Sequence, residues 1–315
     1  MLLKFARLLD KLVNLIAIIL FLLLLLYAGH SIWYQHSVKN ESFLSDELAK
    51  YRHGSQEAAL GDLVKINRDV ISWVTIKDTN IDYPVLQGKD DNEYLNKTVF
   101  GEFSLAGSLF LSSANKRDFS DPYNLVYGHH VEGGAMLADV LEFRDASYFK
   151  DHVSGVLRYP DEDGKARADR IEIFAVVDTN GNDDIIYPGH EAMKRKDLPR
   201  LIKRIDKKAV NKRDIDLGSG ARVIAFSTCE NAESFERVIL FGKLVPMTEE
   251  EIRKAEEEAG NASSARGKHG ILGIIGGLPP WVLPSAGAML LLLLLYVIWR
   301  KLKDRAERDK YGSEK

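Results

Sequence analysis

The sequence predicts a mainly β domain with added helices, held between two membrane-spanning segments. Eight short runs are rich in β-branched and aromatic residues and are separated by Gly, Asn, Asp or Pro, which is typical of strands. Two long uncharged apolar runs lie near the two ends of the chain, each long enough to cross a bilayer. Because eight strands are enough to close a barrel, we expect an eight-stranded β-barrel flanked by N- and C-terminal transmembrane helices.

The first apolar run covers residues 12–34 and follows a basic N-terminus at residues 1–11. A cleaved signal peptide is the competing interpretation. The run ends in the bulky residues Ile32, Trp33 and Tyr34, whereas a cleavage site needs small ones. We therefore expect an uncleaved membrane anchor.

The second apolar run covers residues 270–299, and its prolines place the helical part near 282–299. A basic tail follows at residues 300–315. Positive residues next to a span stay on the cytoplasmic side, so both termini are expected in the cytoplasm and the central domain outside the cell membrane. A buried hairpin of core helices is the alternative, but soluble domains rarely contain two such runs.

The part between the two spans divides into a helical or extended stalk at 35–64, a domain at 65–246 and a charged linker at 247–269. The domain contains all the strand candidates and two expected helices, at 135–143 and 191–208. The strand candidates are residues 70–76, 81–86, 108–111, 124–127, 155–159, 170–177, 222–227 and 237–244.

Composition excludes several classes of function. Lys and Arg number 43 against 46 Asp and Glu, and this balance argues against a nucleic-acid partner, which would require a surplus of positive charge. Cys229 is the single cysteine, so neither an intramolecular disulfide nor a zinc site built on several thiolates can form. We expect no cofactor, although the acidic loops at 161–163 and 183–184 leave a bound calcium open.

Cys229 follows the strand candidate 222–227 and precedes a polar loop. This position places a thiol where a rigid scaffold meets solvent and substrate. A buried cysteine that behaves as a small hydrophobic residue is the alternative. An outward-facing domain gains nothing from an oxidisable thiol unless the thiol reacts, so we interpret Cys229 as a nucleophile.

A cysteine nucleophile needs a nearby base or cation to supply thiolate. His129 and His130 follow the strand candidate 124–127, and Gly128 is expected to let the backbone turn so that an imidazole points outward. The two histidines could also form half of a metal site, but no pattern supplies a third ligand. His129 and His130 are therefore both candidates for the acid and base.

Arg237 opens the strand candidate that follows the cysteine loop. A hairpin of those two strands would bring its guanidinium back beside the thiol, where it could stabilise an oxyanion. An ion pair with Glu233 or Glu236 is the alternative. Cysteine, histidine and arginine together describe acyl transfer through a thioester, with no obvious third group to orient the histidine.

Six stretches of the domain resemble class B sortases in sequence and in order. They are residues 71–74, 79–88, 91–96, 106–110, 127–130 and 227–229, together with Arg237. The combination covers roughly residues 65–245 and is far more specific than any single motif. The resemblance implies a sortase-type β-barrel with added helices on the outer face of a Gram-positive cell membrane.

The resemblance also implies a thiol-protease-like cysteine transpeptidase. Such an enzyme cleaves a sorting signal near the C-terminus of a secreted protein and joins the new carboxyl group to an amine of a cell-wall precursor or a pilin lysine. By position, the catalytic residues fall on His129, Cys229 and Arg237. The second apolar run departs from class B members, which usually carry only an N-terminal anchor, and is more familiar in pilus-building class C enzymes.

Two other functions compete with this interpretation. A non-enzymatic surface binding protein would use the barrel to hold a partner and would leave Cys229 inert. A cysteine hydrolase would carry out the same first step and pass the acyl group to water. Both are kept as alternatives at this point.

Overall fold

The structure is a computed structural model that describes residues 2–42, 46–51, 59–131, 134–162, 165–189, 191–229 and 235–255. The second apolar run at 270–299, the basic tail at 300–315 and the end of the linker lie outside the described residues. Of Cys229 the backbone is described and the side chain is not.

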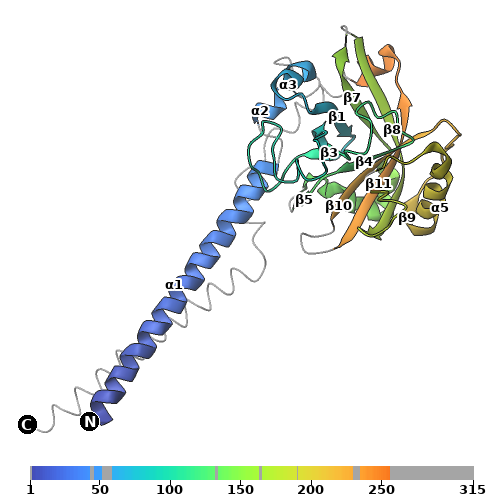
Figure 1. Cartoon of the computed structure of the whole chain (residues 1–315). Helices are drawn as coiled ribbons and strands as arrows, with labels where there is room; N and C mark the ends of the chain where they lie inside the picture. The colour runs from blue at the N-terminus through green and yellow to red at the C-terminus, as the bar shows by residue number, and fades with distance from the viewer. Residues whose placement is uncertain are drawn as a thin grey trace, which may run out of the picture. The chain divides into compact units, whose positions relative to one another are not determined.

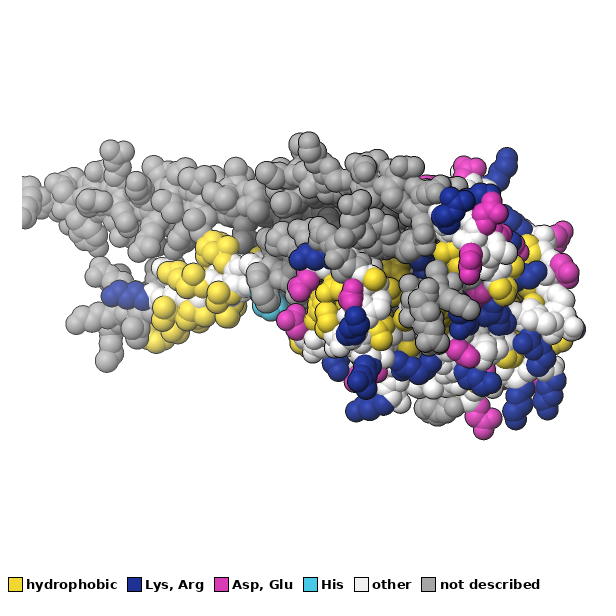
Figure 2. All heavy atoms as spheres, turned by 90° about the horizontal axis from the view of Figure 1, so that it is seen from above, with side chains coloured by type: hydrophobic (Ala, Val, Ile, Leu, Met, Phe, Trp, Pro, Cys, Tyr) yellow, Lys and Arg dark blue, Asp and Glu magenta, His cyan; other side chains and the backbone are white. Residues whose placement is uncertain are grey.

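Helix α1 (Leu2–Ser42) contains the N-terminal apolar run. The segment Lys11–Ser31 within it has a mean hydropathy of 2.7, and its side chains are not buried against the protein. Figure 2 shows this run as an apolar surface along the helix. Its length and composition suit a membrane span, and they equally suit a signal sequence. The short helices α2 (Asp46–Ala49) and α3 (Leu60–Ile66) come next along the chain.

Eight strands close into a barrel, as the sequence predicts (Figure 1). Their order around the barrel is β11-β10-β4-β3-β2-β1-β7-β8, and β8 pairs with β11 to complete it. The pairs β2–β3 and β4–β10 are parallel and the other pairs are antiparallel. The strands are β1 (Val70–Ile76), β2 (Asp82–Leu86), β3 (Leu109–Leu111), β4 (Tyr123–Tyr127), β7 (Ser154–Glu162), β8 (Lys165–Asn180), β10 (Arg222–Cys229) and β11 (Glu236–Pro246).

Three short strands were not expected from the sequence. β5 (His130–Val131) and β6 (Ala135–Met136) form a small hairpin directly after β4. β9 (Ala209–Lys212) pairs with residues 175–177 of β8. Strands of two to four residues are too short to produce a hydrophobic pattern, so sequence periodicity cannot reveal them.

Both expected helices differ from the prediction. The expected helix at 135–143 begins as strand β6, because Met136 has a positive φ of 57° that no helix contains. The 3₁₀ helix η1 (Ala138–Arg144) and helix α4 (Ala146–Asp151) follow it.

The expected helix at 191–208 is shorter than predicted. A single 3₁₀ turn, η2 (Arg195–Asp197), leads into helix α5 (Leu198–Lys208). Pro199 sets this start, since a proline has no N–H to donate and is tolerated only in the first turn of a helix.

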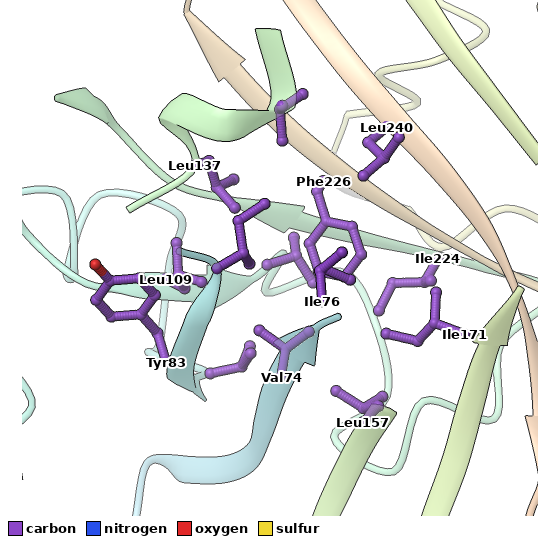
Figure 3. Packing of buried hydrophobic residues seen from close by; sticks show 14 of the residues in the cluster. Val74, Ile76, Tyr83, Leu109, Leu137, Leu157, Ile171, Ile224, Phe226 and Leu240 are labelled. Carbon is purple, nitrogen blue, oxygen red and sulfur yellow. The ribbon is translucent and has the colours of Figure 1, made fainter. Parts of the chain in front are cut away.

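The core has an inner and an outer layer around the barrel wall. Alternate side chains of β10 serve both, with Ile224 and Phe226 inside the barrel and Val223 and Ala225 outside it. Figure 3 shows the inner cluster, in which Phe226 packs among side chains from neighbouring strands. Strand β10 is thus buried on both faces, which fixes the position of its C-terminal end, where Cys229 lies.

Helices α5 and α3 cover the outside of the wall. The apolar face of α5 packs on the outer cluster through Leu198, Leu201 and Ile205. Leu63 of α3 packs in a third cluster with Trp73 of β1. Burial of each such side chain is worth about 1.5–3 kcal/mol, so both helices stabilise the barrel.

Candidate active site

Strands β4 and β10 bring the candidate histidine and cysteine to the same edge of the barrel. The two strands are parallel, and Tyr127 is in register with Ser227. The backbone N–H of Gly128 continues the pairing by donating to the carbonyl of Ser227 at 3.2 Å. Neighbouring strands lie about 4.8 Å apart. His129 and Cys229 each lie two residues past this registered pair, so their backbones reach the same edge of the barrel although a hundred residues separate them.

The β10–β11 hairpin brings Arg237 to the same edge. Cys229 and Arg237 are directly paired across the two antiparallel strands, as the sequence-based hairpin required. One guanidinium N–H of Arg237 donates to the carbonyl of Glu236 at 3.1 Å. The alternative partner Glu233 lies outside the described residues.

A cavity of about 240 Å³ opens at this edge, and both His129 and Arg237 line it. The floor includes Ser227 and Thr228, the two residues that precede Cys229 on β10. The remaining lining residues are Asp91, Leu95, Phe110, Tyr127 and Gly128. The structure thus places two of the three predicted site residues around one hollow and the backbone of the third at its margin.

A backbone carbonyl orients the His129 ring. Its Nε2 lies 2.9 Å from the carbonyl oxygen of Leu95. A carbonyl oxygen can only accept, so Nε2 carries a proton and Nδ1 is left for the chemistry of the site. The sequence offered no acid or amide for this task because the orienting group is a main-chain atom, which every residue type provides.

Gly128 is required for space. A Cβ on Gly128 would lie 2.8 Å from Cγ of Leu137 and closer still to the side chain of Leu109. These two leucines belong to the inner cluster of the barrel. The expectation that this glycine serves a backbone turn is therefore replaced by a packing reason: only a residue without a side chain lets β4 end against the core.

Tyr127 lines the cavity, and Tyr187 packs behind it; sequence reasoning did not assign either residue a role in the site. Tyr127 stacks on Tyr187 with ring centroids 6.4 Å apart and packs at 5.3 Å against Phe110. The hydroxyl of Tyr187 is hydrogen-bonded to Oγ of Ser227 at 2.7 Å. Burial raises the pKa of Tyr127 well above its ordinary value, and the Asp91 carboxylate adds to this effect, so Tyr127 is a neutral phenol.

An ion pair fixes the segment that carries Tyr187. The Asp183 side chain is 3% exposed, lies 2.9 Å from Nζ of Lys208 on α5, and accepts from the backbone N–H of Ile185 and Ile186. Burial alone would raise the pKa of Asp183, but the Lys208 bond and these backbone donors hold it below its ordinary value. No sequence pattern indicated Tyr187. Tyr127 could have been suspected, because it directly precedes Gly128 and His129.

Among the residues that the structure describes, no group of three or more His, Cys, Asp or Glu side chains is placed to hold a metal ion. In the acidic loop at 183–184, the carboxylate of Asp183 is engaged by Lys208 and also lies 3.8 Å from Arg204.

No protein-family model matches the chain. The chain is 31% identical over 221 residues to Sortase B of Listeria monocytogenes, an alignment that covers 65% of this chain and 85% of that protein.

Two solved structures resemble the described fold. A class B sortase of Streptococcus pyogenes that is involved in pilus biogenesis is 35% identical, with 59% of this chain and 97% of that chain covered and a TM-score of 0.52. Sortase B of Clostridium perfringens is 30% identical, with 59% and 100% covered and a TM-score of 0.53.

Proposed function

This chain belongs to the class B sortase family, and from that premise we propose that it is a membrane-anchored transpeptidase that works through a thioester at Cys229. Its substrates are secreted proteins with a C-terminal sorting signal, and its acceptor is an amine. The proposal is supported by the shared edge of the barrel, where His129 and Arg237 line one cavity and the backbone of Cys229 on β10 is paired with Arg237 on β11.

In the first half-reaction, the Cys229 thiolate attacks the carbonyl carbon of the scissile peptide bond. A C–S bond forms, and the electron pair of the carbonyl moves onto its oxygen, where the Arg237 guanidinium stabilises the negative charge. When the intermediate collapses, the C–N bond breaks and the leaving nitrogen takes a proton from Nδ1 of the His129 imidazolium. A thioester and a neutral imidazole remain.

In the second half-reaction, an amine attacks the thioester carbonyl and gives its proton to Nδ1 of His129. The C–S bond breaks and returns the Cys229 thiolate, so thiolate and imidazolium are restored together. The bond from Nε2–H to Leu95 holds the ring in the same orientation through both halves.

We propose that α1 is the uncleaved anchor and holds the domain at the outer face of the membrane. The acceptor is either a cell-wall precursor or a lysine of a pilin subunit. The relative from Streptococcus pyogenes is involved in pilus biogenesis, which supports the second acceptor. The non-enzymatic alternative is not favoured, since the relatives are sortases.

The test is product analysis with a peptide library that samples sorting signals, in the presence and absence of an added amine. Wild type should cleave a subset of peptides and yield amine-linked product, and Cys229→Ala should yield none while unfolding at the same temperature. Activity in Cys229→Ala would reject the nucleophile. Free acid as the sole product in the presence of amine would identify a hydrolase instead of a transpeptidase.

A second experiment separates the enzyme from an inert binding protein. Cys229 should react rapidly with a methanethiosulfonate reagent in the folded protein, because a thiol that attacks a peptide must be accessible and partly ionised. No labelling before unfolding would indicate a buried structural cysteine.

A further inference from the structure

Helix α5 and the turn before it present a row of positive charge to solvent. Lys196, Arg200, Lys203 and Lys207 are all exposed and are spaced four, three and four residues apart. Residues at this spacing lie on one face of a helix. We call these four residues the basic ridge.

The ridge lies opposite the face of α5 that holds the helix on the barrel. Leu198, Leu201 and Ile205 are buried in the outer cluster, and their positions fall on the other side of the helix axis. Packing therefore fixes the helix and points the ridge away from the protein. None of the four ridge side chains is needed to attach α5.

No acidic side chain of the described residues forms an ion pair with the ridge, and Asp184, Glu191 and Asp197 line a cavity together with Lys196 and Arg200 at one end of it. The neighbouring cations Arg204 and Lys208 pair with Asp183, and Lys212 pairs with Asp206. The four ridge residues form no ion pair within the described part of the chain, and like charges at the spacing of Arg200, Lys203 and Lys207 do not stabilise a helix.

The segment that carries the ridge is strongly positive, whereas the chain as a whole is slightly negative. The whole sequence carries a net charge of −3, whereas residues 194–213 contain ten Lys and Arg and two Asp. Figure 2 shows Lys and Arg side chains crowded along one margin of the barrel domain. A patch of this kind attracts a polyanion over roughly a Debye length, about 8–10 Å at physiological salt.

We propose that the basic ridge docks on anionic phospholipid headgroups. The inference rests on the proposed anchoring by α1 and not on the chemistry of Cys229. The connection between α1 and α3 is residues 43–59, and a chain of that length spans at most about 60 Å when fully extended. The domain therefore stays near the membrane, where weak charge contacts are effective, and the polar ridge suits headgroups rather than the hydrocarbon core.

Lysine footprinting on the full chain tests the docking. The wild-type protein is reconstituted in nanodiscs of phosphatidylcholine, with or without phosphatidylglycerol, and acetylated briefly with an amine-reactive ester before peptide mass spectrometry. Lys203 and Lys207 should react roughly fivefold more slowly in the anionic discs, and high salt should remove the difference. The exposed Lys116 and Lys150 are internal controls and should react equally in both discs.

Charge reversal identifies the surface. Arg200→Glu combined with Lys203→Glu should abolish the lipid-dependent slowing at Lys207. The matched variant, Lys116→Glu combined with Lys150→Glu, changes the net charge equally and should retain it. Equal reactivity of Lys207 in both discs with wild type, or slowing that survives charge reversal of the ridge, would overturn the proposal.

Two further experiments distinguish lipid docking from a simple phosphate site and from a failure of the proposed anchor. Inorganic phosphate added to neutral discs should leave Lys207 unprotected, and protection by phosphate alone would overturn a lipid surface in favour of a simple phosphate site. A chain that copurifies with neither disc would reject the anchor instead. The ridge would then be tested by flotation with anionic vesicles, where binding unchanged by charge reversal would reject it.

Discussion

Gly107 supports the carbonyl that orients His129, and Gly107→Ala should therefore damage catalysis although Gly107 itself does not line the cavity. Gly107 has a positive φ of 59° and lies against the backbone of Tyr94 and Leu95. The Leu95 carbonyl accepts the bond from Nε2 of His129 at 2.9 Å. A side chain at Gly107 therefore pushes directly on the acceptor of the imidazole.

The magnitude follows from the geometry. A Cβ at Gly107 would lie 2.6 Å from the Tyr94 oxygen and closer still to the Leu95 oxygen, whereas real Cβ atoms essentially never approach within 3.0 Å. Leu95 must then retreat by more than about 0.4 Å, which stretches the bond to His129 or drags the ring with it. Misplacement of a catalytic group by about 1 Å can cost 10²-fold, so we expect kcat to fall roughly 10- to 100-fold.

The assay compares Gly107→Ala with Gly101→Ala, a matched control in the same connection. Gly101 also has a positive φ, 85°, but the nearest atom to its added Cβ is a side-chain carbon of Lys97 at 3.9 Å. Both variants should lose about 1–2 kcal/mol of stability from left-handed backbone strain. Only Gly107→Ala should lose kcat, measured by peptide cleavage at a temperature where both variants are folded.

Two results would refute this reasoning. Wild-type kcat in folded Gly107→Ala would show that the Leu95 carbonyl does not control the imidazole. An equal loss of kcat in Gly101→Ala would trace the effect to general strain in the loop.

Three further predictions concern the cavity and its supports. Asp183→Asn should lower the free energy of unfolding by about 2–3 kcal/mol at neutral pH. The pKa of Asp183 is lowered in the folded state, so its contribution to stability is complete above the ordinary value of 3.8 and is lost as the pH falls through the lowered value. The free energies of unfolding of variant and wild type, measured in urea, should therefore converge in acid. A difference that stays constant with pH would count against the ion pair. Arg237→Lys should reduce kcat at least about tenfold at an unchanged melting temperature, because an ammonium group cannot reproduce the forked donor geometry of the guanidinium. Turnover equal to that of wild type would show that Arg237 has only a structural role. Tyr187→Phe keeps the stack on Tyr127 and loses the 2.7 Å hydrogen bond to Ser227, so KM should rise a few-fold and the protein should lose about 1 kcal/mol of stability. Unchanged steady-state kinetics would show that this hydroxyl does not contribute to the site.

The strands were predictable from sequence because they are buried on alternating or on both faces. β1, β4, β10 and β11 all carry runs of β-branched and aromatic residues that a core requires. The starts of the two expected helices were harder to predict. Backbone conformation decided them, through the positive φ of Met136 and the proline at the start of α5.

The candidate site divides in the same way. Cys229, His129 and Arg237 could be proposed from the sequence because thiol, imidazole and guanidinium groups carry recognisable chemistry at strand ends. The Leu95 carbonyl could not be found, since a main-chain acceptor leaves no mark in the sequence. Tyr187 could not be predicted either, because its position next to the site depends on a long-range hydrogen bond to Ser227 and on the ion pair between Asp183 and Lys208.

Intact-protein mass spectrometry of the full chain after mixing with a cleaved peptide tests the thioester at Cys229 most directly. The account predicts an acyl adduct on Cys229 in wild type that disappears when an amine is added, and no adduct in Cys229→Ala or His129→Ala. An adduct on another residue, or turnover with no adduct at any time, would contradict it.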